Sequence, residues 1–419
     1  MTAKHVVVCG GGVVGLFCAY YLKAAGHDVT VLEKHSTNDD SCASGSAGYI
    51  SPSHVIPLAA PGVIGLGLKW MLQSRSPFYV KPRMDRELIR WGWHFLRSCS
   101  QANVSRGAPV LAELCLRSRS LFLDFDRRMN NRIELRQKGL LNLCKTQQML
   151  DHEAQVLAKL ANELGVEAKV LNARETSAVE SGTDLDVVGS IYFPNDAHLT
   201  PQLVLRVLTE ELKNQGVIFR FDTTVQGWRM KGNQLAAVIT TDKEIEADEF
   251  VLAGGAWSPA IVDNIGLRLP MQAGKGYSLT LPASPLSLTT SLICAEKRVA
   301  VTPMGRTLRF GGTMEISGIN SQIRPERVQQ IIESAISYFP RLRISDFDGV
   351  KPWCGLRPVS PDGLPYIGRF GRIPNLIAAC GHAMLGLTLA PVTGQMVAEI
   401  VSAKVRHFSS NALSPDRFA

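Results

Sequence analysis

The first residues of the chain contain the feature that most restricts its fold. A short β-branched run, "HVVVC", leads directly into "GGGVVG", and the apolar spacing of "LFCAYYLKAAG" predicts a helix that ends at Gly26. Gly10, Gly12 and Gly15 therefore form the pattern G-x-G-x-x-G between a strand and a helix. The first glycine permits the tight turn, the second lets a pyrophosphate approach the backbone, and the third lets the helix pack closely on the strand. This combination predicts a dinucleotide-binding βαβ unit.

A second strand supports this interpretation. "DVTVLEK" follows the predicted helix and places Glu33 at the strand end, where a carboxylate can accept hydrogen bonds from both hydroxyls of an adenosine ribose. A G-x-G-x-x-G pattern alone also occurs in ordinary glycine-rich turns. The two strands, the helix and the terminal glutamate together favour a nucleotide site.

The segment after Glu33 distinguishes two kinds of dinucleotide protein. A nicotinamide dehydrogenase usually builds its sheet from two contiguous βαβαβ halves. Here the chain instead enters "SCASGSAGYISPSHVIPLAAPG", a long ordered loop that can wrap an extended cofactor. Later, "ADEFVLAGGAWS" and "NLIAACGHAMLGLTLAPVTGQMVAEIVS" each return as a strand followed by a glycine-rich turn. A nucleotide domain assembled from three separated segments is more typical of a flavoprotein, so the sequence predicts an α/β fold class with FAD as cofactor.

Composition excludes several other classes. The chain has 419 residues, 45% hydrophobic and 20% charged, which suits a large core and two or three domains. Its net charge of +8 comes from scattered Lys and Arg residues, so we expect no nucleic-acid site. Nine cysteines without a C-x-x-C pair or a metal-ligand spacing predict no metal site and a reducing, cytoplasmic location. We find no signal-peptide pattern and no uninterrupted apolar stretch of about 20 residues, so we expect neither secretion nor a spanning helix.

Six motifs, in order along nearly the whole chain, carry a resemblance to a known family. They are "GGGVVG", "APGVIGLGLKWM", "GKGYSLT", "GGTMEISG", "GLRPVSPDGLPYIG" and "CGHAMLGLT". With them the chain resembles the FAD-dependent D-amino-acid dehydrogenases of bacteria, within the D-amino-acid oxidase and glycine oxidase superfamily. The resemblance implies a glutathione-reductase-like FAD-binding Rossmann domain interleaved with an α+β substrate domain, whose antiparallel sheet roofs the flavin. We assign residues 1–85, 181–260 and 345–419 to the FAD domain, and residues 86–180 and 261–344 to the substrate domain.

The resemblance also implies an activity. A D-amino acid would present its α-hydrogen to flavin N5, hydride transfer would give an imino acid, and water would hydrolyse the imino acid to a 2-oxo acid and ammonia. Electrons would pass to a quinone or the respiratory chain. Two alternatives stay open: a dehydrogenase for D-hydroxyproline or D-proline, and an oxidase that passes electrons from D-amino acids or glycine to oxygen. A flavin-binding protein without activity is disfavoured because Arg357 and Tyr277 are both present.

Arg357 stands between Leu356 and Pro358, in apolar company that favours a fixed anionic partner. A guanidinium can bind a planar carboxylate through two parallel hydrogen bonds. In the superfamily the arginine of the "GLRP" element binds the substrate carboxylate, and Arg357 matches it. The alternative is a structural arginine bound to Asp362 or to a backbone carbonyl.

Two further catalytic residues are predicted. Tyr277 and Lys275 in "GKGYSLT" begin the first roof strand, and we expect strand alternation to turn Tyr277 toward the substrate. His382 in "CGHAM" matches a family histidine beside the flavin, and a packing role is an equal alternative. Glycine oxidases carry a second arginine in the turn where this chain has Met384, so we expect room there for a substrate side chain larger than hydrogen.

The predicted FAD contacts lie in the glycine turn, the end of the second strand, the following loop and three later turns. They are Gly10, Gly12, Val13, Val14, Gly15, Glu33, Lys34, Ser46, Ala47, Gly48, Ser51, Val225, Gly254, Gly255, Trp257, Gly386, Leu387 and Thr388. Family members hold the adenine through backbone groups at the position of Val225. The helix that begins near Gly386 should direct its positive end toward the pyrimidine side of the flavin.

Three residues of the loop after the glycine turn are candidates to contact the isoalloxazine, and one of them is Ser51. Tyr49 and His54 lie in the loop after the glycine turn and are candidates to reach the isoalloxazine, whereas Ser51 is better explained as a turn-stabilising residue. Cys354 does not have the spacing expected for covalent flavin attachment. We therefore predict a buried thiol at Cys354 and a FAD that is bound without a covalent bond.

Residues 54–73, "HVIPLAAPGVIGLGLKWMLQ", are unusually apolar for a connection between elements. Together with Lys69, Trp70 and the net positive charge, this pattern is typical of a segment that lies on an anionic membrane surface. The alternative is packing against the protein's own core, and both interpretations stay open. The membrane interpretation predicts a peripheral protein on the inner face of the cell membrane, where a quinone would accept the electrons.

Overall fold

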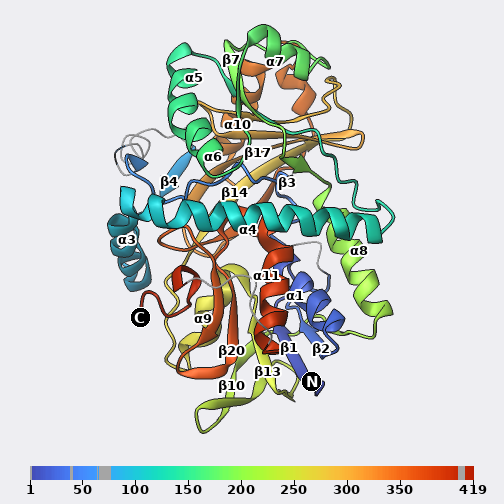
Figure 1. Ribbon diagram of the computed structural model, residues 1–419, viewed down its shortest axis with the longest axis vertical. Coiled ribbons are helices and arrows are strands. Elements are labelled where there is room, and N and C mark those ends of the chain that lie inside the picture. Colours follow the sequence, from blue (N-terminus) through green and yellow to red (C-terminus); the bar gives the residue numbers. More distant parts are fainter. Residues whose placement is uncertain (1, 38–40, 64, 66–76, 404–410) are drawn as a thin grey trace.

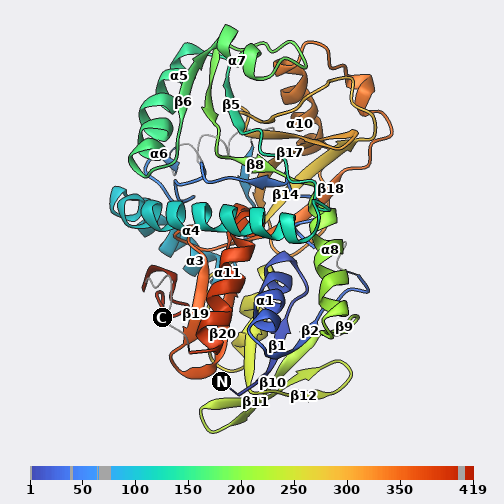
Figure 2. The same cartoon turned by 45° about the vertical axis from the view of Figure 1, so that its right-hand side comes forward.

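The computed structural model describes residues 2–37, 41–63, 65, 77–403 and 411–419. Two β-sheets occupy opposite ends of the molecule, and helix α4 (Gln101–Arg128) crosses between them (Figure 1). The N-terminal strand belongs to the lower sheet in this view. The larger sheet forms the upper end, and the turned view shows its strands β14, β17 and β18 on the far side of α4 from the N-terminal strand (Figure 2).

The lower sheet has six strands in the order β19-β20-β13-β1-β2-β9. Its members are β1 (His5–Cys9), β2 (Asp28–Leu32), β9 (Ile218–Arg220), β13 (Glu249–Leu252), β19 (Tyr366–Phe370) and β20 (Ile373–Cys380). All neighbouring pairs are parallel except β19 with β20. One face is covered by the helices α1 (Val13–Ala24), α8 (Pro201–Asn214) and α11 (Gly386–Val401). The predicted N-terminal βαβ unit is confirmed.

The other face of this sheet packs against three antiparallel strands, β10 (Val225–Lys231), β11 (Gln234–Thr240) and β12 (Glu244–Glu246). Strand alternation explains the two cores, because Val6 and Val8 join the helical side while Val7 and Cys9 join the other. The resulting three layers are the predicted Rossmann-type FAD-binding domain.

The upper sheet has nine strands. They are β4 (Phe78–Val80), β5 (Leu140–Cys144), β6 (Lys169–Asn172), β7 (Gly189–Phe193), β14 (Gln272–Leu281), β15 (Ser291–Cys294), β16 (Val299–Met304), β17 (Thr307–Ile316) and β18 (Trp353–Val359). The main order is β18-β14-β17-β16-β15-β5-β7-β6, and β4 pairs with β17. Apolar side chains of one face form a core with α10 (Pro325–Tyr338). The opposite face near β14, β17 and β18 carries the candidate site.

Pairing in this sheet differs from the predicted domain boundaries. Strands β4, β7 and β18, which the boundaries assign to the FAD domain, pair instead with β17, β5 and β14 of the upper sheet. These partners are distant in sequence, so local patterns could not indicate them. Conversely, α4 of the predicted substrate segment packs Phe122 and Phe125 edge-on against Phe17 of α1.

Helical spacing in residues 86–180 is largely confirmed. The region contains α3 (Arg86–Ser98), α4, α5 (Gln147–Glu153), α6 (Lys159–Glu163) and α7 (Ala173–Val179). It also contains β5 and β6, which the helical interpretation missed because they are short and pair with distant segments.

One helical stretch, Ala383–Val401, is long and apolar enough to cross a membrane by length and composition. The sequence predicts no spanning helix, because threonine, glycine and glutamine residues interrupt the apolar run of this stretch. In the fold, 78% of its apolar window is buried, and α11 packs on α1 in the core of the FAD-binding domain. We therefore interpret it as a core helix.

Candidate active site

The glycine turn after β1 leaves space for a phosphate at the start of α1. Gly10 has a φ of +123°, and a Cβ on Gly15 would lie 1.9 Å from the Gly10 carbonyl oxygen, so only glycine permits this close packing. In contrast, nothing lies within 4 Å of a Cβ built on Gly12. The N-terminus of α1 has no side-chain cap. Its open N–H groups and the free space at Gly12 fit the pyrophosphate of FAD.

Glu33 lies beside this turn. Its Oε2 accepts a hydrogen bond from the Gly11 N–H at 2.9 Å, and its Oε1 accepts one from the His35 N–H at 3.0 Å. The Thr223 N–H donates to the Glu33 carbonyl at 2.9 Å, which brings the chain just before Val225 to the same edge. The carboxylate is therefore fixed at the end of β2, in the position predicted for binding the ribose.

The turn after β13 lies against the glycine turn. A Cβ on Gly10 would lie 3.1 Å from the Gly254 backbone nitrogen, and Gly255 adopts a φ of +56°. The turn continues to Trp257, and the Lys34 ammonium lies 3.2 Å from the centre of its ring. The structure thus brings these predicted cofactor residues to one end of the sheet, and their contacts with FAD stay a prediction.

The loop that follows β2 is fixed to the upper sheet by side chains that the sequence did not indicate. Nη1 of Arg309 on β17 donates to the carbonyl oxygens of Ser44 and Ser46, at 2.8 Å each. The Thr302 hydroxyl donates to the Ala47 carbonyl at 2.7 Å. The predicted FAD loop is therefore held by residues of the predicted substrate sheet. Burial lowers the pKa of Arg309 to about 10.

The start of α11 contacts the next part of this loop. The Thr388 hydroxyl donates to the Tyr49 carbonyl at 2.9 Å and accepts from the Ser51 N–H at 3.4 Å. No side chain caps α11, so the positive end of the helix around Gly386 and Leu387 is directed at the region of this loop. This placement agrees with the predicted role of the helix beside the flavin.

Tyr49 and His54 are placed for structure rather than for contact with a flavin. The Tyr49 hydroxyl donates to the Leu292 carbonyl and accepts from the Val301 N–H at 3.1 Å, so its ring is inserted into the upper sheet. Burial lowers the pKa of His54 to about 4, and its Nδ1 lies 3.3 Å from the Ser53 hydroxyl. The expectation that either side chain reaches the isoalloxazine is not supported by these positions.

Arg357 lies on the polar face of the upper sheet. In the pairing of β14 with β18 it stands opposite Gly274, and its guanidinium lies over Gly276, where a Cβ would come within 2.0 Å of Nη1. Gly355 and Trp353 share this face by alternation. The Trp353 ring is packed flat between glycines, since a Cβ on Gly45 or on Gly355 would lie 2.1 Å from it.

The partners of Arg357 exclude Asp362 as its structural anchor, whereas the backbone-carbonyl alternative is met by one hydrogen bond. Asp362, the alternative partner, is instead bound by Nε and Nη2 of Arg417, at 2.8 and 2.9 Å. Nη1 of Arg357 donates to the Thr313 carbonyl at 2.9 Å. Among the described residues no carboxylate lies within ion-pair distance of Arg357, and burial lowers its pKa. Its remaining N–H groups can therefore bind a ligand carboxylate.

Tyr277 lies on the opposite face of this sheet. In β14 it stands opposite Cys354, its hydroxyl donates to Glu315 Oε2 at 2.8 Å, and it is 1% exposed within the core beneath α10. Lys275 lies on the same face, with its ammonium 3.4 Å from Glu315 Oε1. Tyr277 and Lys275 are two residues apart on one strand, so their side chains lie on the same face. The expectation that strand alternation would turn Tyr277 toward the substrate and Lys275 away from it is therefore wrong. The structure therefore separates Tyr277 from Arg357.

His382 is also directed into the protein. Its Nε2 lies 2.9 Å from the Thr393 hydroxyl of α11, and burial lowers its pKa to about 3. The packing alternative therefore describes its ring better than a catalytic role. The neighbouring Met384 is 53% exposed and lies in the short helical turn that contacts β18.

Cys354 is partly buried, and its thiol donates to the Ser321 carbonyl at 3.3 Å. It faces the side of the sheet that carries Tyr277, away from Arg357. In the described ranges no group of three or more His, Cys, Asp or Glu side chains is arranged to hold a metal ion.

Thr313 and Arg309 are the site residues that sequence reasoning missed. Both lie in β17, within "TLRFGGTMEI", where charged and small residues alternate with Leu308 and Phe310 of the core. This alternation was a usable signal, because a polar residue on the inner face of a roof strand must have a partner.

Comparisons with known proteins agree with this geometry. Residues 5–400 match the family described as DAO, FAD dependent oxidoreductase. The chain is 34% identical to a D-amino acid dehydrogenase of Methylobacterium radiotolerans, over 99% of this chain and 100% of the relative. It is 33% identical to a D-amino acid dehydrogenase of Vibrio atlanticus, with the same coverage.

Among solved structures, glycine oxidase from Geobacillus kaustophilus superposes with a TM-score of 0.79 at 22% identity, over 100% of this chain and 99% of that one. L-proline dehydrogenase from P. horikoshii gives a TM-score of 0.74 at 19% identity, over 99% and 98% of the two chains. These similarities support the fold, and the sequence match extends over the glycine turn, the roof strands and Arg357. The chain therefore belongs to the DAO family of FAD-dependent oxidoreductases.

Proposed function

We propose that this protein oxidises D-amino acids with FAD, giving imino acids that water hydrolyses to 2-oxo acids and ammonia. The observation that carries the proposal is the half-buried guanidinium of Arg357, which has no carboxylate partner among the described residues and lies on the polar face of the roof sheet. The full-length relatives named D-amino acid dehydrogenase support the same substrate class.

The residues of the chain act mainly by binding and orientation. Arg357 binds the substrate carboxylate through two charge-assisted hydrogen bonds, which fixes the α-carbon relative to the roof. Gly12 and the start of α1 hold the pyrophosphate, and Glu33 holds the ribose. When bound, FAD supplies the hydride acceptor. Desolvation lowers the pKa of His54 to about 4 and the pKa of His382 to about 3, so these described histidines near the site are weak bases, poorly suited to remove a proton.

Met384 supports a substrate larger than glycine. This side chain is uncharged, half-exposed and adjacent to the strand that carries Arg357. It therefore supplies no second positive charge of the kind that the family's glycine oxidases have in this turn. D-Proline and D-hydroxyproline stay within the substrate class that Arg357 can bind.

An anaerobic substrate screen tests the proposed activity. The purified protein should be yellow, and D-amino acids should bleach the flavin while their L-enantiomers do not. Recolouring with a quinone faster than with air would support a dehydrogenase, whereas rapid recolouring in air would support an oxidase. A flavin that no D-amino acid bleaches would contradict the proposal.

We further propose that the electron acceptor is a membrane quinone and that the protein is cytoplasmic and peripheral on the inner face of the membrane. Of the predicted membrane segment, residues 64 and 66–73 lie outside the described residues. In its described part, Val55 and Ala59 are fully buried, which favours internal packing there. Support comes instead from α3, whose Ile89, Trp93 and Leu96 are 61%, 51% and 54% exposed.

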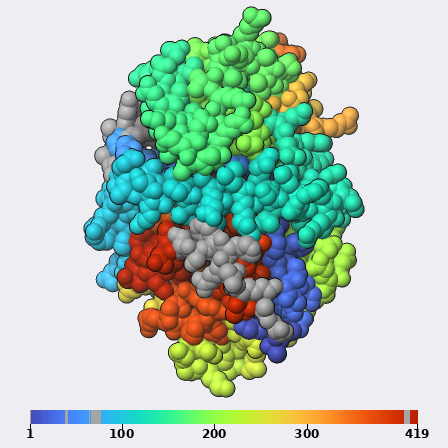
Figure 3. All heavy atoms as spheres, in the orientation of Figure 1, coloured from blue at the N-terminus to red at the C-terminus, as the bar shows by residue number. Residues whose placement is uncertain are grey.

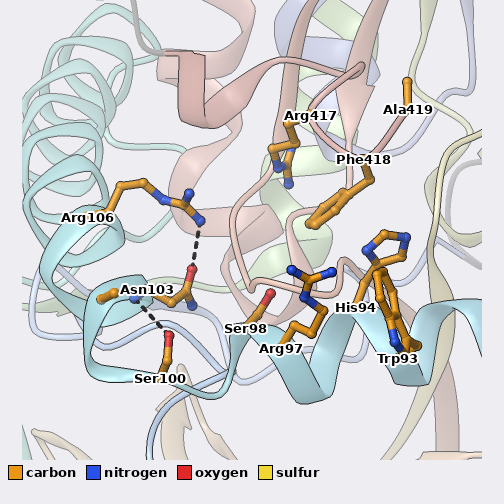
Figure 4. Close-up of a pocket in the computed structure, with 11 residues that line it drawn as sticks. Trp93, His94, Arg97, Ser98, Ser100, Asn103, Arg106, Arg417, Phe418 and Ala419 are labelled. Carbon is orange, nitrogen blue, oxygen red and sulfur yellow. Dashed lines mark hydrogen bonds between the residues drawn. The ribbon is translucent and has the colours of Figure 1, made fainter.

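These three side chains recur at i, i+4 and i+7 and form one apolar stripe on α3, which lies at the edge of the molecule (Figure 3). Beside it, a surface cavity of about 510 Å³ is lined by Arg97, Arg106, Arg417 and the rings of Trp93 and Phe418 (Figure 4). Arg97 and Arg106 have no carboxylate partner among the described residues. An apolar stripe beside unpaired guanidinium groups fits an anionic lipid surface.

Sedimentation with vesicles tests the membrane proposal. The protein should sediment with phosphatidylglycerol vesicles at low salt and much less with phosphatidylcholine vesicles. Replacing Trp93 and Leu96 by Ser should abolish sedimentation. Replacement of Val170, which is 52% exposed on β6, by Ser is the matched control and should change nothing. A parent protein that stays in the supernatant would contradict the proposal.

A further inference from the structure

We infer that Gly276 and Thr313 are positioning residues that together form the seat of the Arg357 guanidinium. The inference rests on the proposed role of Arg357 in binding the substrate carboxylate. It assigns a function to a local irregularity between β14 and β17, which neither the motifs nor the family match explains.

The first half of the seat is the bare backbone of Gly276. A Cβ at this position would lie 2.0 Å from Nη1, 2.2 Å from Nη2 and 2.3 Å from Cζ of Arg357. Both terminal nitrogens would be nearer to this Cβ than Cζ is, so the Nη1–Nη2 end of the guanidinium packs directly against the bare strand. Any side chain at position 276 would lift it from the sheet. The strand itself need not move, since the far end of an arginine side chain can give way.

The second half of the seat is the carbonyl of Thr313. The pairing of β14 with β17 shifts register between Lys275 and Tyr277, and Thr313 lies in the irregular part of β17. Thr313 has a φ of +64°. It is the only β-branched residue with a left-handed backbone in the described part of the chain. Such a conformation is strained for threonine and persists only where surrounding contacts enforce it.

The consequence of this backbone geometry is a hydrogen bond. The Thr313 carbonyl leaves the ladder and accepts from Nη1 of Arg357 at 2.9 Å. The Thr313 hydroxyl is buried and makes no hydrogen bond within the described residues, so the side chain gains nothing polar from this position. The backbone, rather than the hydroxyl, is therefore the functional part of Thr313.

Together the two contacts fix the position of the guanidinium end. Gly276 permits the close approach of the two terminal nitrogens, and the Thr313 carbonyl engages Nη1, while the other N–H groups make no hydrogen bond with the described residues. A bidentate carboxylate complex requires a fixed guanidinium, because two parallel hydrogen bonds form only when the two planes align.

The test compares Gly276→Ala with Gly311→Ala in the holoenzyme. Gly311 on β17 is a matched control, because the nearest atoms to a Cβ there lie at 3.9 and 4.0 Å. The probes are propionate, a carboxylate without an amine to oxidise, and its uncharged analogue propionamide, with affinities read from the change in flavin absorbance. Gly276→Ala should weaken propionate binding about ten-fold or more and propionamide binding less than about two-fold. Gly311→Ala should change neither.

Three outcomes separate this inference from the proposed function. If Arg357→Leu leaves propionate binding unchanged, the carboxylate role of Arg357 is wrong. If Arg357→Leu weakens propionate binding while Gly276→Ala does not, only the seat is wrong. Thr313→Gly keeps the carbonyl and relieves the strain, so propionate should bind within about two-fold of the parent. A ten-fold loss in that variant would show that the threonine side chain acts instead, and would overturn the assignment of its backbone.

Discussion

Replacing Arg357 by Leu removes the guanidinium that, in the proposed function, binds the substrate carboxylate. The structure gives this guanidinium a single described hydrogen bond, from Nη1 to the Thr313 carbonyl, and no ion pair with a described carboxylate. The folded protein therefore loses little when the charge is removed, and a half-buried charge without a carboxylate partner disappears with it. We expect the variant to fold and to retain its yellow FAD.

The expected loss is in catalysis. A charge-assisted hydrogen bond to the substrate contributes about 1.5–3 kcal/mol, so the loss of one such bond corresponds to about a ten- to hundred-fold fall in kcat/KM, with a further loss from the second bond and from misorientation of the α-carbon. Arg357→Lys should recover only part of the rate, because an ammonium provides charge without the planar fork. An amide analogue of the substrate should react slowly with the parent enzyme. The ratio of kcat/KM between the parent and the Leu variant should be much smaller for this amide than for the carboxylate substrate.

The assay is anaerobic bleaching of the flavin, followed by stopped-flow absorbance over a range of D-amino acid concentrations. FAD content and the thermal midpoint provide the control for folding. If Arg357→Leu retained FAD and was reduced at the parent rate, the guanidinium would be a structural anchor for the Thr313 carbonyl. The assignment of the active site to this face of the sheet would then be wrong.

The cofactor end and the buried histidine give three further predictions. Glu33→Gln should weaken FAD retention, measured by gel filtration, while leaving bleaching of the reconstituted enzyme nearly intact, and unchanged retention would contradict the ribose assignment. Gly12→Ala should lose FAD but unfold at the thermal midpoint of the FAD-free parent, whereas Gly15→Ala should lower that midpoint. A Cβ meets open space at Gly12 but would lie 1.9 Å from the Gly10 carbonyl oxygen at Gly15. Burial lowers the pKa of His382 from 6.5 in the unfolded chain to about 3 in the folded protein, so the unfolded chain binds the proton more readily. The stability that this neutral histidine allows above pH 6.5 is therefore lost as the pH falls toward 3. His382→Gln should reduce this loss in urea unfolding between pH 8 and pH 5, and an unchanged pH dependence would show that other groups cause it.

The cofactor-binding half of the fold could be predicted from local sequence. Its signals are contiguous: Gly10, Gly12 and Gly15 occupy one turn, and Glu33 follows on the next strand. Each feature depends on backbone conformation over a few residues, which the sequence encodes directly. The nine-stranded sheet gave no comparable signal, because β5, β7 and β18 pair with strands far away in the chain.

The site was predictable only where one residue could be judged by itself. Arg357 was recognisable because a cation among apolar residues needs a partner. Tyr277 was misjudged because its motif is shared with the family while its direction depends on the face of β14 that meets α10, and that face is set by tertiary packing. The sequence does not distinguish a packing role from a catalytic role for His382, because the direction of its ring also depends on tertiary packing. The hydrogen bond to Thr393 favours the packing role.

Two arginines on the polar face of the roof show why residue type alone does not define a binding site. Arg309 directs its guanidinium to the carbonyls of Ser44 and Ser46 and to the Thr280 hydroxyl, so its hydrogen bonds hold the FAD loop against the sheet. Arg357 makes one hydrogen bond to the described residues and rests on a glycine. Both cations lie in the same sheet, Arg309 buried and Arg357 half-buried, but only Arg357 keeps N–H donors free for an anion. The difference follows from what each strand places beneath the guanidinium, and it supports the proposed division of roles, with Arg309 positioning the loop and Arg357 recognising the substrate.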